Sequence, residues 1–320
     1  MAGSKLFVAF LLALVAGSAL GQSFPSKAVT LIATFRPDDI VSEFLRDFAP
    51  IASRYIGQPV VIENRQGAAG TLGPSTMAAT ARPDGYSLAL LTITSFRVPH
   101  MERVSWDPRK DFTYIIGIVN LAFGVVVKSD SQFKTIDDLI RYAKANPGGL
   151  RYGSTVYSAT AHLAMEDLGL KTGARFLRVP TRNNPETEKA LMEGRIMAIA
   201  DSTTWGPQVD AGAFRLLLTF GERRSRWNAP TAQELGFDVL AYAPWGIVGP
   251  KGMDPKVVKR LHDAFNRALD DPEYEKLLKR LEMVDWYKSS EDYAEWAVDQ
   301  FRFQRALIER TIGLGRGIRE

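Results

Sequence analysis

The sequence predicts an α/β protein of two lobes, because strand patterns alternate with helix patterns and the alternation starts twice. The first series begins near residue 28 and the second near residue 123. Such alternation is typical of parallel sheets with helices on their faces. The chain has 320 residues, of which 46% are hydrophobic and 24% charged. A length of this order suits about two globular domains.

The first series predicts three strands and two helices. Residues 28–35 (AVTLIATF) are β-branched and apolar, as in a buried strand. Ile40, Phe44 and Phe48 recur at helical spacing and define one face of a helix over 40–55. The remaining elements are strands at 60–63 and 86–92 and a helix that begins at the stretch 67–70.

The second series predicts the other lobe and a helical C-terminal part. The expected strands are 123–128, 150–153, 176–179, 197–201 and 216–220, with helices at 135–145, 160–168 and 185–193. Further helices are expected from Asp254-Pro255, from about 272 and from about 290. No long linker separates the two series, so we expect the chain to cross between the lobes. Lobe 1 is predicted to contain residues 22–121 and 228–320, and lobe 2 residues 122–227.

The N-terminus has the pattern of a cleavable secretory signal. Lys5 precedes an apolar run from Leu6 to Val15, and small residues follow, with Ala19 and Gly21 at the −3 and −1 positions. The run is shorter than the roughly 20 apolar residues that a bilayer-spanning helix needs, which disfavours the alternative of a membrane anchor. We therefore predict a signal peptide at 1–21 and a periplasmic location.

Composition excludes several classes of function. The chain has no Cys, which removes thiol catalysis and Cys-bound metals. Its three His, at 100, 162 and 262, do not have metal-ligand spacing, and we expect no metal and no cofactor. The formal net charge of +4 is spread along the chain without a basic block, which argues against nucleic-acid binding. No nucleophile elbow or phosphate-binding loop occurs.

Candidate ligand-binding residues follow the predicted strands, since ligands of such sheets bind beyond the carboxyl ends of the strands. The loops concerned are 35–39, 92–96, 154–160, 181–183 and 201–205. The hydroxyls of loop 154–160 and the N–H groups of the following helix suit an anion, although a Ser or Thr there also serves as a simple cap. Arg36 and Arg182 are equally compatible with ligand contact and with a solvated surface. From these loops we select Phe35, Arg36, Asp38, Asp39, Thr92, Thr94, Ser154, Tyr157, Ser158, Thr160, Thr181, Arg182, Asp201 and Trp205.

Several ordered segments give the sequence a family resemblance. They are Phe24-Pro-Ser-Lys27, Gly57-Gln-Pro-Val-Val-Ile-Glu-Asn-Arg65, Gly67-Ala-Ala-Gly70, Pro83-Asp-Gly-Tyr86, Trp106-Asp-Pro-Arg-Lys-Asp-Phe112, Tyr152-Gly-Ser154 with His162-Leu-Ala164, Val179-Pro180, Pro230-Thr231 with Glu234-Leu-Gly236, and Trp245-Gly-Ile-Val-Gly-Pro250. Together they resemble the Bug or TctC-like receptors of tripartite tricarboxylate transporters. The resemblance implies a two-lobed periplasmic binding protein, each lobe a mostly parallel sheet flanked by helices. It also implies a ligand cleft between the lobes, no catalysis, and delivery of a small solute, usually a carboxylate, to membrane permease subunits. We expect a monomer.

The sequence departs from the family pattern after the first strand. The family's paired glycines are replaced by Asp38 and Asp39, its hydroxyl by Val41 and its Asp by Ser42, whereas Asp201 is retained. Ser42 therefore joins the candidate ligand residues. Two alternatives stay open. The Asp pair favours a ligand with an amine, a cation or a neutral polar group, or the two carboxylates only cap the helix while the usual carboxylate binds in a shifted pose.

Two other functions compete with solute delivery. A sensing receptor that partners a signalling protein needs only the same ligand-driven closure. A hydrolase would use His162, at the start of a predicted helix, with a nearby Ser. The common alternative for His162 is a packed side chain near a helix N-terminus.

Overall fold

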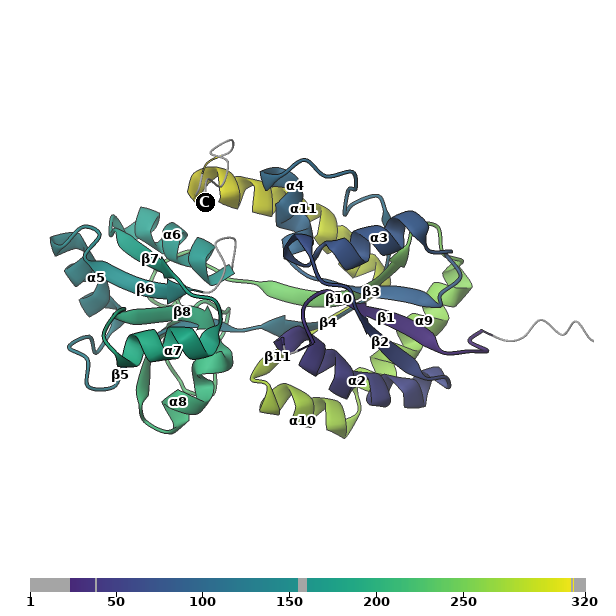
Figure 1. Cartoon of the computed structure of the whole chain (residues 1–320), viewed down its shortest axis with the longest axis horizontal. Coiled ribbons are helices and arrows are strands. Elements are labelled where there is room, and N and C mark those ends of the chain that lie inside the picture. The colour runs from purple at the N-terminus through teal and green to yellow at the C-terminus, as the bar shows by residue number, and fades with distance from the viewer. Residues whose placement is uncertain (1–23, 38, 155–159, 312, 314–320) are drawn as a thin grey trace, which may run out of the picture.

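The protein has two lobes side by side, each built around its own sheet (Figure 1). The computed structural model describes residues 24–37, 39–154, 160–311 and 313. The predicted signal peptide lies outside these residues, as do Asp38, Tyr157 and Ser158. We call the two parts the six-stranded lobe and the five-stranded lobe after their sheets. The predicted division into two α/β lobes is confirmed.

The six-stranded sheet is mixed. Its strand order is β11 (Met283–Lys288), β4 (Phe112–Leu121), β10 (Ala243–Pro250), β3 (Ser87–Leu91), β1 (Val29–Ala33) and β2 (Val60–Asn64). The predicted parallel arrangement holds for β2, β1 and β3, with Val29 opposite Val60 and Thr30 opposite Ser87. It does not extend to β10, β4 and β11, because β10 is antiparallel to both β3 and β4, and β11 is antiparallel to β4.

The five-stranded sheet repeats this plan. Its strand order is β7 (Phe176–Pro180), β6 (Leu150–Ser154), β8 (Ala198–Ser202), β5 (Phe123–Lys128) and β9 (Phe214–Thr219). Strands β7, β6 and β8 are parallel, whereas β5 is antiparallel to β8 and β9. The chain crosses between lobes from β4 to β5 and from β9 to β10. The carboxyl ends of β6 and β8 and the crossovers therefore lie at the same edge of the sheet.

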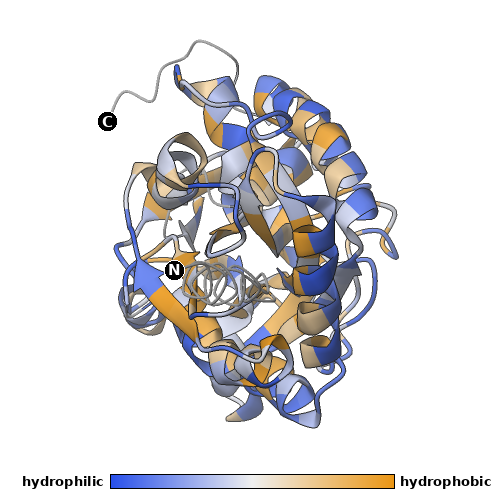
Figure 2. Cartoon of the chain, turned by 90° about the vertical axis from the view of Figure 1, so that its right-hand side faces the viewer, coloured by the Kyte–Doolittle hydropathy of each residue, from blue (hydrophilic) through white to orange (hydrophobic). Residues whose placement is uncertain are grey.

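Helices cover both faces of each sheet. In the six-stranded lobe they are α2 (Ile40–Ile56), α3 (Leu72–Thr80), α4 (Thr94–Met101), α9 (Pro255–Leu269), α10 (Pro272–Arg280) and α11 (Ser290–Thr311), with the short 3₁₀ helix η1 (Ala68–Gly70). In the five-stranded lobe they are α5 (Ile136–Ala145), α6 (Thr160–Thr172), α7 (Asn184–Met192) and α8 (Gly206–Asp210), with η2 (Thr203–Trp205). In Figure 2 single helices show both blue and orange, as expected for amphipathic helices that cover a sheet.

The strands bury side chains on both faces, which explains their nearly continuous apolar sequence. In β1, Leu31 packs with Phe44 and Phe48 of α2, whereas the next residue, Ile32, packs on the opposite face with Met77 of α3. The core on the Ile32 face continues into the five-stranded lobe, where it includes Phe123 of β5. The two lobes therefore share one apolar core on that side.

Candidate functional site

Asp39 is the N-cap of α2. Its side chain accepts a hydrogen bond from the backbone N–H of Val41 at 2.9 Å. A carboxylate at this position satisfies a free N–H group and meets the positive end of the helix dipole. The structure thus contains the capping contact that the sequence left as one of two alternatives. Arg36, three residues earlier, is exposed, and its carbonyl accepts a hydrogen bond from the Asp39 N–H.

Phe35 and Ser42, at the two ends of this loop, are both bonded to Asn64 of β2. The fully buried Ser42 hydroxyl accepts a hydrogen bond from Asn64 Nδ2 at 2.6 Å, and the same amide group donates to the Phe35 carbonyl at 3.0 Å. The Phe35 ring lies over Gly70, where a Cβ atom would be 2.6 Å from the ring Cζ. Gly70 also has a φ of +86°, so glycine is required there for two reasons. Any contact of Phe35 or Ser42 with a ligand stays a prediction.

Three buried hydroxyls at the carboxyl ends of strands have no hydrogen-bond partner within the described part of the chain. Thr34 follows β1, Ser95 lies in the first turn of α4 after β3, and Ser154 ends β6; all three residues are 0% exposed. An unsatisfied buried hydroxyl costs about 1–3 kcal/mol. Such groups therefore indicate an additional partner, such as water or a ligand. Sequence reasoning selected Ser154 and missed the other two, since Thr34 also fits a strand pattern and Ser95 lies among other hydroxyls.

Thr92 and Thr94 satisfy each other at the end of β3. Their hydroxyl oxygens are 2.8 Å apart, and Thr92 is buried. They lie directly before Ser95. The loop 92–96 therefore brings three hydroxyls to the carboxyl edge of the six-stranded sheet, and their contact with a ligand stays a prediction.

Arg97 is a buried cation that sequence reasoning missed. Its side chain is 1% exposed, and it extends from α4 to the other lobe, where Nη1 donates to Thr160 Oγ1 at 2.9 Å. Its Nε donates to Gln304 Oε1 of α11 at 2.6 Å. Burial lowers the pKa of Arg97 to about 9, so the guanidinium stays protonated at neutral pH. A positive charge is therefore held against the first residue of α6, at the end of the predicted ligand loop.

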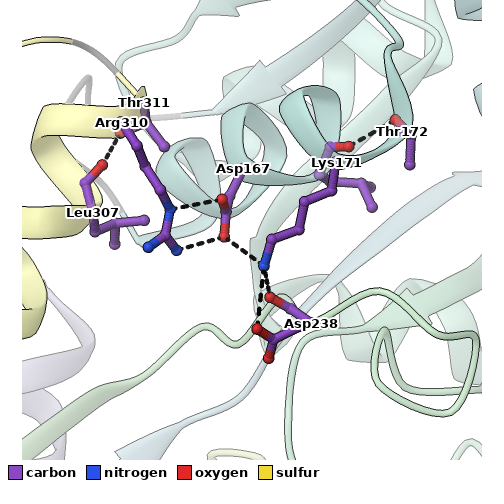
Figure 3. A network of polar contacts seen from close by, with 8 residues as sticks. Asp167, Lys171, Thr172, Asp238, Leu307, Arg310 and Thr311 are labelled. Carbon is purple, nitrogen blue, oxygen red and sulfur yellow. Dashed lines mark hydrogen bonds and ion pairs between the residues drawn. The ribbon is translucent and has the colours of Figure 1, made fainter.

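Helix α6 is fastened to the other lobe a second time, about two turns further on (Figure 3). Asp167 accepts two hydrogen bonds from Arg310 of α11, at 2.9 and 2.8 Å, and its side chain is only 4% exposed. Lys171 lies 3.5 Å from the same carboxylate and also donates to the backbone carbonyl of Asp238, in the segment between β9 and β10. The placement of α6 relative to the six-stranded lobe thus depends on charged contacts at both of its ends.

In the five-stranded lobe, Thr181 and Arg182 differ sharply in burial. The buried Thr181 hydroxyl is 2.5 Å from that of Thr187, and the Thr181 N–H donates to the Ser154 carbonyl at 3.4 Å. Arg182 has an 88% exposed side chain that pairs with Glu186 at 3.0 Å. The structure thus gives Arg182 a local surface partner, and ligand contact by either residue stays a prediction.

Asp201 and Trp205 lie at the end of β8. One carboxylate oxygen of Asp201 accepts a hydrogen bond from the Ser202 N–H at 2.7 Å. The Trp205 ring is 1% exposed, packs 5.0 Å from the Trp227 ring, and its indole N–H donates to the Asp201 carbonyl. The surroundings of Trp205 are those of a core residue. Its place in a ligand site stays a prediction.

Comparison with known proteins decides the family. Residues 44–314 match the model of the tripartite tricarboxylate transporter family receptor, TctC. The chain belongs to this receptor family. The resemblance found in the sequence is thereby confirmed, and the protein is a solute-binding receptor of the TctC family.

Relatives of the receptor share nearly its whole length. A UPF0065 protein in the gbd 5' region of Cupriavidus necator is 41% identical over 307 residues, covering 95% of this chain and 93% of its own. A solved structure titled as a periplasmic transporter has a TM-score of 0.78 at 30% identity, covering 91% of this chain and 99% of its own. An R. palustris protein solved with adipate also has a TM-score of 0.78, at 24% identity, covering 91% and 99% of the two chains.

His162 lies in the receptor as a packed residue. It is buried in the first turn of α6, and its Nδ1 is 2.6 Å from the hydroxyl of the fully buried Tyr152. Burial, together with the Arg178 cation, lowers the pKa of His162 to about 4. A general base works best with a pKa near the operating pH. This environment therefore favours the packed role over the hydrolytic alternative.

Two structural features are absent from the described residues of the receptor. In ranges 24–37, 39–154 and 160–311, we find no helix that is both long and apolar enough to cross a membrane. The same part of the chain contains no group of three or more His, Asp or Glu side chains that suits a metal ion.

Proposed function

We propose that the receptor captures a small organic carboxylate between its two lobes and delivers it to the permease subunits of a tripartite transporter. The observation that carries this proposal is the set of unsatisfied buried hydroxyls of Thr34, Ser95 and Ser154 at strand ends in both lobes. Hydroxyl donors satisfy carboxylate oxygens without a fixed counter-charge. The R. palustris neighbour solved with adipate supports the same ligand class.

The charges near these hydroxyls favour a carboxylate over an amine. Arg97 places a buried positive charge beside Thr160, at the start of α6. The Asp39 carboxylate, which would attract an amine, already accepts the Val41 N–H at the start of α2. An incoming anion therefore meets unused hydroxyl donors, a cation and helix N-termini, which together stabilise negative charge. We propose the fifteen residues selected from the sequence, together with Thr34, Ser95 and Arg97, as the region that surrounds the ligand.

The proposal includes the arrangement of the chain. We keep the lobe boundaries at residues 22–121 with 228–320 and at 122–227, and the distribution of strands supports them, since β5 to β9 form one sheet and the others form the second. Delivery to a permease requires export, for which we propose cleavage of a signal peptide at 1–21. We propose that the exported receptor acts as a monomer.

The decisive experiment titrates the purified receptor with adipate, malate, citrate, putrescine and lysine by calorimetry. We expect saturable binding of at least one of the carboxylates, and Ser154→Ala should weaken it about tenfold, the loss of about one charge-assisted hydrogen bond. Ser75→Ala is the matched control, because the Ser75 hydroxyl donates to the Leu72 carbonyl of its own helix, 3.2 Å away. Binding of the two amines alone, or equal affinities in both variants, refutes the proposed ligand class.

Delivery is tested separately in cells. A strain that lacks this gene should lose uptake of the carboxylate that binds in vitro, and the wild-type gene should restore uptake while the Ser154→Ala gene restores less at low solute concentration. Normal uptake in the deletion strain, with loss of a transcriptional response to the same solute, identifies the sensing receptor instead.

A further inference from the structure

A cavity lies where the lobes join. It has a volume of about 270 Å³ and is lined by the first crossover at 120–123, by the segment 219–225 that leaves β9, by residues 241–242 before β10, by 284–286 of β11, and by Thr203. None of the described residues proposed for the carboxylate site lines it. An occupant of this cavity touches both lobes and both crossover segments.

Two hydroxyls in the lining of this cavity have no hydrogen-bond partner among the described residues. They are Thr219 Oγ1 and Ser225 Oγ, and Thr219 is only 3% exposed. The backbone of Thr219 is fixed, since its N–H donates to the Pro230 carbonyl at 3.0 Å and its carbonyl accepts the Ala232 N–H at 2.9 Å. The unsatisfied hydroxyl therefore results from a rigid local structure. Buried polar groups of this kind need a partner in the cavity.

The charged groups of the lining leave one cation available. Arg224 is held by Glu234, at 2.8 and 3.0 Å, and Arg223 has no ion pair within the described part of the chain. The lining also contains two carboxyl groups. Burial and the nearby exposed Glu222 raise the pKa of the Tyr242 hydroxyl, and burial raises the pKa of the Asp285 carboxyl, which favours its neutral form. The unused groups are thus one guanidinium and two hydroxyls, a donor set that suits a carboxylate.

Most of the remaining lining is apolar. Leu121 and Phe123 of the first crossover line this cavity together with Ala241, Val284 and Trp286, and Asn120, Thr203 and Tyr242 add polar side chains. An apolar cavity of about 150 Å³ holds a benzene molecule. A cavity of about 270 Å³ therefore has room for one ring and a carboxylate beside it.

We propose that this junction cavity is a second ligand site, which binds a monocarboxylate with a single-ring or similarly compact apolar body. The carboxylate contacts Arg223, Thr219 and Ser225, and the body lies against Leu121, Val284 and Trp286. This site is independent of the carboxylate site at the strand ends, and either proposal can fail without the other.

The test uses three probes that share one ring and differ in charge: benzoate, benzamide and benzylamine. We expect benzoate to bind the purified full chain saturably and at least tenfold more tightly than the other two. Thr219→Val and Arg223→Gln should each weaken benzoate binding about tenfold, which corresponds to about 1.4 kcal/mol. Arg302→Gln is the matched control, since Arg302 is 74% exposed on α11 and pairs with Asp299 of the same helix; it should leave the benzoate affinity unchanged.

Two further readouts exclude a merely structural effect. Without a ligand, Thr219→Val should raise the melting temperature, because it removes an unsatisfied buried hydroxyl while keeping the shape of the side chain. Ser154→Ala should leave benzoate binding intact. If Ser154→Ala abolishes benzoate binding and Thr219→Val does not, benzoate occupies the strand-end site and the second site is refuted. Absence of saturable benzoate binding up to millimolar concentration refutes it as well.

Discussion

Acidification below about pH 6.5 should destabilise the receptor through one residue, His162. Its ring is buried at the start of α6, 2.6 Å from the Tyr152 hydroxyl, and the Arg178 cation opposes a second positive charge nearby. Burial is the largest cause of the low pKa of about 4. Glu166 lies 3.8 Å away, and burial raises the pKa of its own carboxyl. The neutral imidazole is therefore the form that the fold accepts.

The sign and size of the effect follow from proton linkage. An unfolded His has a pKa of about 6.5, and that of folded His162 is about 4. Between these values the unfolded chain binds more protons, so the free energy of unfolding rises with pH. The contribution is fully present above about pH 6.5 and is lost as the pH falls toward 4. At about 1.4 kcal/mol for each pH unit, the loss amounts to about 3 kcal/mol.

Urea unfolding at several pH values between 4 and 7 measures this loss. The matched variant is His162→Asn, which keeps a hydrogen-bonding side chain and does not titrate. Burial also lowers the pKa of His100. Such groups titrate in both proteins, so their contributions to the pH dependence of stability cancel in the difference. We expect the stability gap between wild type and variant to shrink by about 3 kcal/mol from pH 7 to pH 4. Parallel stability curves for the two proteins would refute this reasoning.

Three further substitutions test individual contacts. Asp39→Ala removes the N-cap of α2 and should lower the free energy of unfolding by about 1 kcal/mol, measured by urea denaturation. Arg97→Met removes the bond to Thr160 but also the desolvation cost of a buried cation. We therefore expect a change in the free energy of unfolding below about 2 kcal/mol, with roughly tenfold faster amide exchange in the first turn of α6. Unchanged exchange would contradict a stabilising role of the Arg97–Thr160 hydrogen bond. Asp167→Asn breaks the bidentate pair with Arg310 and should lower the free energy of unfolding by about 1–2 kcal/mol. Arg310→Gln should lower the melting temperature by a similar amount as Asp167→Asn. Unequal decreases would show that the pair is not the cause.

The strand and helix order could be predicted where the local pattern agrees with the fold. The helix over 40–55 matches α2 within one residue, because its apolar face, its Asp39 cap and its terminal Gly57 all indicate the same limits. The strands β4, β10 and β11 were missed. In β10 (APWGIVGP), two prolines and two glycines hide the strand pattern, and Gly246 is required because a Cβ atom there would be 2.3 Å from the Tyr293 ring.

The candidate site could be predicted only as a set of loops. The rule that ligands bind at the carboxyl ends of strands leads to Ser154 without any structure. The sequence cannot predict which hydroxyls lack a hydrogen-bond partner. Whether Thr34 or Ser95 has a partner depends on the distances between segments that are far apart in the sequence. Arg97 shows the same limit, because its partner Gln304 is 207 residues away in the sequence. A single Arg within the sequence FRVPH looks like any helix residue until α11 covers it.

Helix α6 connects the two aspects of the receptor, ligand capture and lobe arrangement. Its first residue, Thr160, ends the predicted ligand loop and bonds to Arg97 of the other lobe. Its third turn contains Asp167, which bonds to Arg310 of the six-stranded lobe, the lobe that also contains Arg97. Lobe motion that opens the ligand region must either break these contacts or move α6 against its own sheet. The proposed binding of a ligand at Ser154 and the contact at Thr160 therefore act on the same equilibrium between lobe arrangements. If the contact favours the arrangement that binds the ligand, the ligand stabilises the contact by the same free energy.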